Sequence, residues 1–222
     1  MKQKYAVGID GCSDGWVVVT GETSELKILS IDVISSLEHI SEEYLTSHIV
    51  IDIPIHLYHS KIRLCDKEAK AFLGKKFQSS IFYAPPAEIL TCVNYIEANK
   101  KCKEMYQVGL SKQSWNLFPK ILEAQSLNKT LHNYHEGHPE CSFKLLNHGN
   151  DLKFKKKNPL GIIERYELLQ FNRVHPQIKN IKHYSGFKLD DLLDACSLYW
   201  TAYRRANHLQ TVLGDSHKGI YA

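Results

Sequence analysis

The stretch YAVGIDGCSDGWVVVT, residues 5–20, decides the fold. It contains two runs of strand-forming residues, 5–10 and 16–20, and the turn between them is bracketed by Gly11 and Gly15. A short turn between two such runs predicts an antiparallel hairpin. The first run ends on an aspartate, so the hairpin also places a carboxylate at the end of a strand that is otherwise apolar.

Two further strands and one helix are expected after the hairpin. Residues 26–33 alternate well enough to form a third strand, and residues 48–53, ending before Pro54, predict a fourth strand covered on both faces. Between these strands, Ser35 and Ser36 fit a helix cap. One face of that helix would hold four apolar side chains: Leu37, Ile40, Tyr44 and Leu45. A helical crossover joins parallel strands, so the order β-β-β-α-β predicts that the fourth strand lies parallel to an earlier one.

The rest of the chain is mostly helical. We expect helices over residues 61–73, 87–108 (one or two helices), 111–127 (kinked or broken at Pro119), 140–146, 159–170 and 188–213. Residues 134–137 are expected to form a fifth strand. A length of 222 residues fits one domain. We therefore expect a single α/β domain over 1–222, with core strands at about 4–54, a mostly helical middle at about 60–130, and the fifth strand and C-terminal helices at about 133–222.

Composition restricts the class of protein. The chain is 43% hydrophobic and can bury a core, and its net charge of +4 is compatible with a polyanionic partner without requiring one. The densest basic run, residues 153–157, is by itself typical of a solvated loop. The six cysteines form no Cys-x-x-Cys pair, which argues against a zinc ribbon. With no signal peptide and no long apolar run, we expect a cytoplasmic protein with buried, free thiols and no membrane partner; the sequence leaves the oligomeric state open.

Acidic residues stand at places that the expected fold brings together. Asp10 and Asp52 lie near the C-terminal ends of two strands, and neighbouring strands are about 5 Å apart. The two carboxylates therefore become neighbours if the strands pair in parallel. At the start of the last helix, Asp191 and Asp194 share one face, whereas Asp190 or Asp191 also fits a helix cap. Asp194 lies a turn further in and is not explained by capping.

Carboxylates packed together repel one another unless a cation neutralises them. Mg²⁺ or Mn²⁺ is the natural partner of an all-oxygen ligand set, and we expect Asp10, Asp52, Asp191 and Asp194 to hold such an ion. Two ions roughly 4 Å apart can activate a water and stabilise a leaving oxygen in phosphodiester cleavage. Taken alone, Asp10 and Asp52 are more often turn or capping residues than metal ligands, so the prediction depends on their combination with the strand order and the last helix.

Residues 135–140 supply a further polar group. Glu136 and Glu140 are candidates to assist catalysis beside His138, because acids and histidines close together suit general acid–base chemistry. The alternative is a helix N-terminus, with Pro139 in its first position and Glu140 in its first turn. His135 and His138 could bind zinc, although no third ligand has a suitable spacing.

Seven short motifs, in order along nearly the whole chain, resemble one known family. They are GIDGC with Gly15-Trp16 (8–16), DIPI (52–55), CDKEA with Leu73-Gly74 (65–74), SSIF with Pro85 (79–85), LSKQSW with PKILE (110–123), EGHPE with Phe143 (136–143) and DDLLDA (190–195). The family is catalogued as a domain of unknown function, family 429, and is described as a predicted nuclease. The resemblance implies a ribonuclease H-like mixed sheet with a helical insertion and a long C-terminal helix. His56 departs from the family pattern, which has glycine after DIPI.

Our leading hypothesis is a metal-dependent nuclease that hydrolyses phosphodiester bonds, with nucleic acid as its partner and Asp10, Asp52, Asp191 and Asp194 in its site. The first alternative is an ATP-binding phosphotransferase-like protein of the sugar kinase and actin superfamily, which shares the same core. The second is a non-catalytic binding module of the same fold. A mixed basic and aromatic group would suit nucleic acid: Lys112, Gln113, Trp115 and Lys120.

Overall fold

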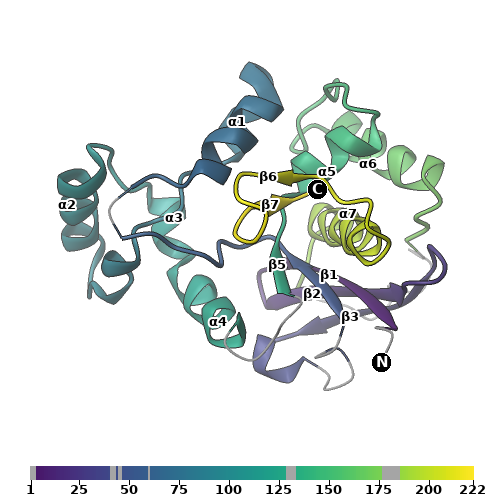
Figure 1. Ribbon diagram of the computed structural model, residues 1–222, viewed down its shortest axis with the longest axis horizontal. Helices are drawn as coiled ribbons and strands as arrows, with labels where there is room; N and C mark the ends of the chain where they lie inside the picture. Colours follow the sequence, from purple (N-terminus) through teal and green to yellow (C-terminus); the bar gives the residue numbers. More distant parts are fainter. Residues whose placement is uncertain (1–3, 41–43, 45–46, 60, 129–133, 177–185) are drawn as a thin grey trace.

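The computed structural model describes residues 4–40, 44, 47–59, 61–128, 134–176 and 186–222 (Figure 1). The strands of the main sheet are β1 (Tyr5–Cys12), β2 (Gly15–Glu22), β3 (Ile28–Ile34), β4 (His48–Ile51) and β5 (Tyr134–Glu136). The α-helices are α1 (Leu64–Phe77), α2 (Tyr95–Tyr106), α3 (Lys112–Asn116), α4 (Phe118–Asn128), α5 (Pro139–Leu146), α6 (Pro159–Phe171) and α7 (Leu189–Ala206). Short elements complete the described chain: the 3-10 turns η1 (Leu37–His39), η3 (Gln78–Ser80) and η4 (Ala87–Thr91), and the strands β6 (Val212–Leu213) and β7 (Ile220–Tyr221).

The five strands form one mixed sheet in the order β3-β2-β1-β4-β5. β1 pairs with β2, and β2 with β3, in antiparallel fashion, which confirms the hairpin and the third strand. β4 lies parallel to β1, and β5 lies parallel to β4. The sequence therefore predicted the α/β class, the parallel pairing of the fourth strand and the existence of the fifth.

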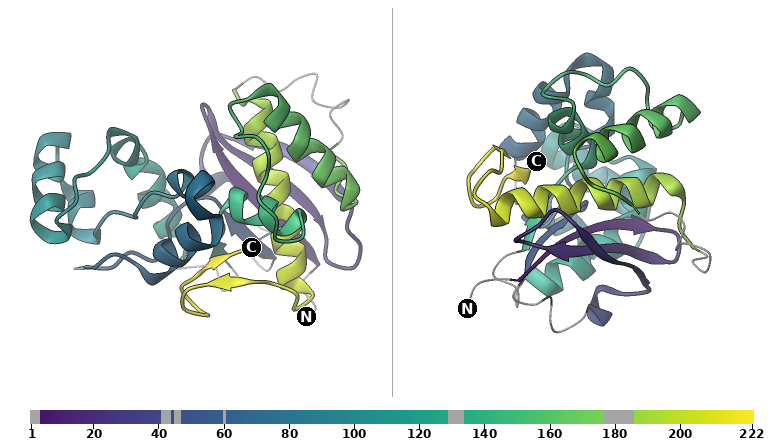
Figure 2. Two further views of the ribbon diagram at one scale, coloured as in Figure 1. Left: turned by 90° about the horizontal axis from the view of Figure 1, so that it is seen from above. Right: turned by 90° about the vertical axis from the view of Figure 1, so that its right-hand side faces the viewer.

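Side chains of β1 and β4 alternate between two apolar layers, because successive residues of a strand point to opposite faces. Ala6 and Val50 belong to the layer that contains α7, α5 and part of α1. Ile9 and Ile51 belong to the opposite layer, where η1 and α4 pack. Figure 2 shows α7 lying across one face of the sheet, with α6 outside it.

Gly8 permits the close approach of α7 to β1. A Cβ atom at this position would lie 2.1 Å from the backbone nitrogen of Tyr199 and 2.2 Å from the carbonyl oxygen of Ala195. Any side chain there would push the helix away from the sheet. Because Asp194 precedes Ala195 in the chain, this contact also sets how closely Asp194 approaches the strand ends.

The opposite face is connected to α4 through Glu123. One of its carboxylate oxygens accepts a hydrogen bond from Trp16 Nε1 at 3.1 Å, and the other accepts one from the backbone N–H of Leu37. The carboxylate thus joins β2, η1 and α4, which are far apart in sequence. This explains the acidic residue of the PKILE motif as a structural one.

Several expected helix boundaries need correction. The helix expected over 61–73 begins at Leu64, and Gly74 is a non-helical kink (φ 67°) after which the helix continues to Phe77. The segment expected over 87–108 divides into η4 and α2, and the one over 111–127 divides at Leu117, before Pro119, into α3 and α4. The helix expected over 37–45 begins as a short 3-10 turn, η1, which is capped by Ser36. Residues 41–43 and 45–46 of that segment lie outside the described chain.

The last helix ends earlier than expected. We predicted that it would reach Leu213, but α7 stops at Ala206, and His208 then adopts a left-handed conformation (φ 58°) that a helix cannot continue. The backbone N–H of Leu209 donates to the carbonyl of Arg204 and closes the turn. Residues 212–213 instead form β6, which pairs with β7 in a hairpin that the sequence did not reveal.

No helix among the described residues is long and apolar enough to cross a membrane. All six cysteines are buried and free, and burial raises the thiol pKa of Cys141 and Cys196 well above its usual value. Their burial confirms the expectation for structural cysteines in this chain.

Candidate functional site

Asp10 and Asp52 lie side by side at the carboxyl ends of β1 and β4. Ile9 pairs with Ile51, and the backbone N–H of Asp52 donates to the carbonyl of Ile9 at 3.0 Å. Each aspartate directly follows one of these paired residues, so both leave the sheet at the same edge. Ligand sites of open α/β sheets form at this edge. Asp10 is only 7% exposed and Asp52 is half-buried.

Asp194 reaches the same place from α7. It is 2% exposed, and its Oδ2 accepts a hydrogen bond from Lys156 Nζ at 2.7 Å. Burial raises the pKa of Asp10 well above its usual value, and the charges of Asp194 and Asp52 raise it further. The pKa of Asp194 is also raised by burial, although Lys156 opposes the shift. The structure therefore brings together three of the expected carboxylates from three different elements.

Asp191 has a local role at the start of α7. Its Oδ2 accepts a hydrogen bond from the backbone N–H of Lys188 at 2.8 Å, which is the geometry of a capping residue. Burial raises its pKa above the usual value, while this hydrogen bond opposes the shift. The side chain also lines the same cavity as Asp10, and its charge raises the pKa of Asp10 less than the charges of Asp194 and Asp52 do.

The carboxylate of Glu136 is bound by Arg63, and it is not grouped with Asp10, Asp52 and Asp194. Glu136 is in register with Ile51 of β4, the residue that precedes Asp52. Its side chain therefore starts one residue earlier along the sheet than that of Asp52. Both guanidinium nitrogens Nη1 and Nη2 of Arg63 contact its carboxylate, at 2.7 and 2.8 Å, and the N–H of Ile55 donates to it at 3.0 Å. Arg63 also binds Asp66. Both oxygens of Glu136 thus accept hydrogen bonds within this buried network.

Glu140 has an equivalent partner in Arg165. Arg165 Nη2 contacts both carboxylate oxygens of Glu140 at 2.7 Å, and both side chains are buried. Sequence reasoning missed Arg63 and Arg165. Arg63 stands just before the CDKEA motif and Arg165 lies within α6, so neither has a local pattern that identifies its acidic partner.

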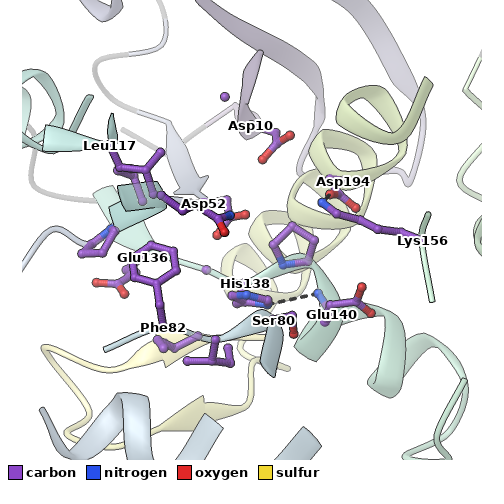
Figure 3. Close-up of a pocket in the computed structure, with 18 of the residues that line it drawn as sticks. Asp10, Asp52, Ser80, Phe82, Leu117, Glu136, His138, Glu140, Lys156 and Asp194 are labelled. Carbon is purple, nitrogen blue, oxygen red and sulfur yellow. Dashed lines mark hydrogen bonds and ion pairs between the residues drawn. The ribbon is translucent and has the colours of Figure 1, made fainter. Parts of the chain in front are cut away.

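A cavity of about 540 Å³ joins these residues, and all six of the predicted site residues line it. Figure 3 shows Asp10, Asp52 and Asp194 around one part of it, with Lys156 beside Asp194 and His138, Ser80 and Phe82 along the opposite wall. Basic and polar side chains also line the cavity: Lys120, Lys155, Lys156, Lys157, Ser79, Ser80 and Gln113. The basic run of residues 153–157 thus contributes to the site and is not only a solvated loop.

Trp115, His138 and His135, the other candidates from the sequence, contact neighbouring residues within the fold. Trp115 packs against Phe118, with ring centroids 4.7 Å apart. His138 caps α5: its Nδ1 accepts a hydrogen bond from the N–H of Glu140 at 3.2 Å. His135 instead packs on Tyr221.

The donor set of the site is made of hard oxygens. In the described part of the chain, no three acidic, histidine or cysteine side chains form a ready-made cluster for a metal ion. Near Asp194, the position of a cation is taken by the ammonium group of Lys156. The carboxylates of Asp10 and Asp52 also line the cavity, and neither forms such an ion pair within the described ranges of the chain. Carboxylate oxygens of this kind suit Mg²⁺ or Mn²⁺.

Comparison with known families finds one match. A model described as "Protein of unknown function (DUF429)" matches residues 8–218, which is nearly the whole chain. Comparison with proteins of curated function gives no match, and comparison with solved structures gives none. The family resemblance drawn from the seven motifs is confirmed, while the nuclease description attached to it stays a prediction.

Proposed function

We propose that this protein, which belongs to the DUF429 family, is a divalent-metal-dependent nuclease that hydrolyses phosphodiester bonds of nucleic acid. The observation that carries the proposal is the meeting of Asp10, Asp52 and Asp194 in one cavity at the carboxyl edge of the sheet. Structural carboxylates are normally paired, as Glu136 and Glu140 are here. Asp10 is more than nine-tenths buried and receives no hydrogen bond from the described residues.

An ionised carboxylate that is buried without a partner is costly, and a bound cation would remove that cost. Asp10 and Asp52 would hold the ion, with Asp194 beside them. When bound, Mg²⁺ or Mn²⁺ would supply a Lewis acid and a water that is more easily deprotonated. These residues would also position the ion at the sheet edge, where the cavity admits a substrate.

The basic side chains around the carboxylates favour a polyanionic substrate. Lys155 and Lys157 are exposed, and Lys120 is half-buried with its ammonium group 4.1 Å from the centroid of the Trp16 ring. Phosphate groups would be attracted by these charges, whereas a neutral substrate would gain nothing from them. Ser79 adds a hydroxyl donor for a phosphate oxygen, whereas the Ser80 hydroxyl donates to the carbonyl of Phe77 at 2.7 Å.

His138 offers one more donor to the site. Because its Nδ1 accepts the N–H of Glu140, the neutral ring carries its proton on Nε2. The side chain lines the cavity, so this N–H can donate a hydrogen bond to a phosphate oxygen.

The finer fold assignment belongs to the same proposal. We place the chain among the ribonuclease H-like proteins. The β-β-β order before the crossover, the antiparallel β1–β2–β3 pairing and the parallel β1–β4 pairing support this assignment.

The test is cleavage of single- and double-stranded DNA and RNA in Mg²⁺ and in Mn²⁺, by the wild type and by Asp10→Asn. Asp190→Asn is the matched control, because Asp190 neighbours the same cluster but does not line the cavity. We expect the wild type and Asp190→Asn to cleave at least one substrate and Asp10→Asn to lose at least 100-fold in rate, about the effect of removing one preorganised charge-stabilising group. Equal activity of wild type and Asp10→Asn on every substrate would refute the proposal. ATP hydrolysis without nucleic acid cleavage would favour the phosphotransferase alternative.

A further inference from the structure

Lys156 carries a positive charge that is in direct contact with the carboxylate cluster. Its Nζ is 2.7 Å from Asp194 Oδ2, and its side chain is 40% exposed against 3% for that of Asp194. The charge of Asp194 is the main cause that raises the pKa of Lys156 above its usual value, with Asp10 and Asp52 adding to the shift. The ammonium group of Lys156 is thus paired directly with Asp194.

The loop that carries Lys156 is held on both sides. Lys76 Nζ donates to the carbonyls of Leu152 and Lys153, at 3.0 and 2.6 Å. The two oxygens of Glu164 accept the backbone N–H groups of Lys153 and Phe154, at 2.7 and 3.0 Å. These contacts connect the loop to α1 and to α6. The loop that carries Lys156 is therefore anchored to the rest of the fold, and its side chain extends from this anchored backbone to the aspartates.

The charges of the site then favour a single divalent ion. When all three aspartates are ionised, Lys156 neutralises Asp194 by direct contact, and one divalent cation would neutralise Asp10 and Asp52. A second divalent cation beside Asp194 would lie next to the ammonium group and would be repelled by it. Asp10 and Asp52 lie on neighbouring strands at the cavity, and no ammonium group of the described residues contacts either carboxylate.

We propose that Lys156 takes the place of the second metal ion, so that the site binds one divalent cation, between Asp10 and Asp52. This inference rests on the proposed metal-dependent function. It makes Lys156 a permanent positive charge of the site, in place of the second ion of the two-ion route to phosphodiester cleavage.

The experiment is a calorimetric titration of the purified protein with Mn²⁺, and separately with Mg²⁺, read as the number of ions bound. We expect one ion for the wild type and for Lys156→Arg, which keeps the charge. Lys156→Met should bind two, because it leaves Asp194 with a free carboxylate and removes the repulsion. Lys153→Met is the control from the same loop, because its exposed side chain does not line the cavity, and it should bind one ion like the wild type. Circular dichroism of each variant checks that it is folded.

Digestion with trypsin, with and without Mn²⁺, tests where Lys156 lies when the ion is bound. We expect the rate of cleavage within residues 153–157 to be unchanged or lower with the ion, because the lysine stays in place. Faster cleavage with Mn²⁺ would mean that the ion displaces Lys156, and would overturn the inference. Two ions in the wild type would overturn it while leaving the proposed function intact. Binding of none, together with absent nuclease activity, would overturn both.

Discussion

The contact of α7 with β1 at Gly8 makes a quantitative prediction about stability. In Gly8→Ala, the new Cβ would stand 2.1 and 2.2 Å from two backbone atoms of α7, whereas ordinary contacts begin at 3.4 Å. Backbone atoms in the middle of a helix cannot rotate away as a side chain can, so α7 must shift by about 1 Å across a packed core. Overpacking of this kind costs about 1–3 kcal/mol, and a clash with backbone belongs at or above the upper end.

Urea unfolding followed by circular dichroism measures this cost. We expect Gly8→Ala to lower the free energy of unfolding by about 3 kcal/mol or more, which for a chain of this size corresponds to a fall in Tm of about 6–12 °C. Gly11→Ala is a matched control on the same strand, because its Cβ would meet only the flexible end of Lys120, at 3.5 Å. It should change the free energy by about 0.5 kcal/mol or less. Equal effects of the two substitutions would show that α7 does not lie against β1 as described.

Three further predictions concern charged and polar groups around the site. Arg165→Met leaves Glu140 buried without its partner and should lower the free energy of unfolding by about 3–5 kcal/mol at pH 7, measured by urea unfolding; a loss below about 1 kcal/mol would contradict the buried Arg165–Glu140 ion pair. Burial lowers the pKa of His135 to about 4. Below about pH 6.5 the imidazole of His135 is therefore protonated in the unfolded chain but stays neutral in the folded chain. This difference lowers the free energy of unfolding by up to about 3 kcal/mol between pH 6.5 and pH 4. His135→Gln should flatten that part of the pH profile of the urea midpoint, and an unchanged profile would contradict the burial of this ring. Asp191→Ala removes a helix cap and should cost about 1 kcal/mol in thermal or urea unfolding, and an unchanged stability would argue against the capping contact.

The sequence by itself determined the sheet and the carboxylates at its edge. Strand patterns, turn glycines and helix caps act over a few residues, so the strands and the starts of α5 and α6 follow from local sequence. The crossover connection implies that the first and fourth strands are parallel. The positions of Asp10 and Asp52 at one edge of the sheet then follow from the lengths of these two strands. The grouping of Asp194 with them was also expected, because capping did not explain its position in the helix.

Only the tertiary structure decided which charges are paired. Glu136 is bound by a residue 73 positions away, Asp194 by one 38 positions away and Glu140 by one 25 positions away. No local pattern encodes these partners, because each depends on how helices and loops pack on the sheet. The end of α7 and the β6–β7 hairpin have the same origin: a two-residue strand carries too little pattern to be recognised, and it forms because a partner segment lies beside it. The same packing brings Lys156 into the carboxylate cluster, and so the basic loop that the sequence left as a solvated surface becomes part of the site.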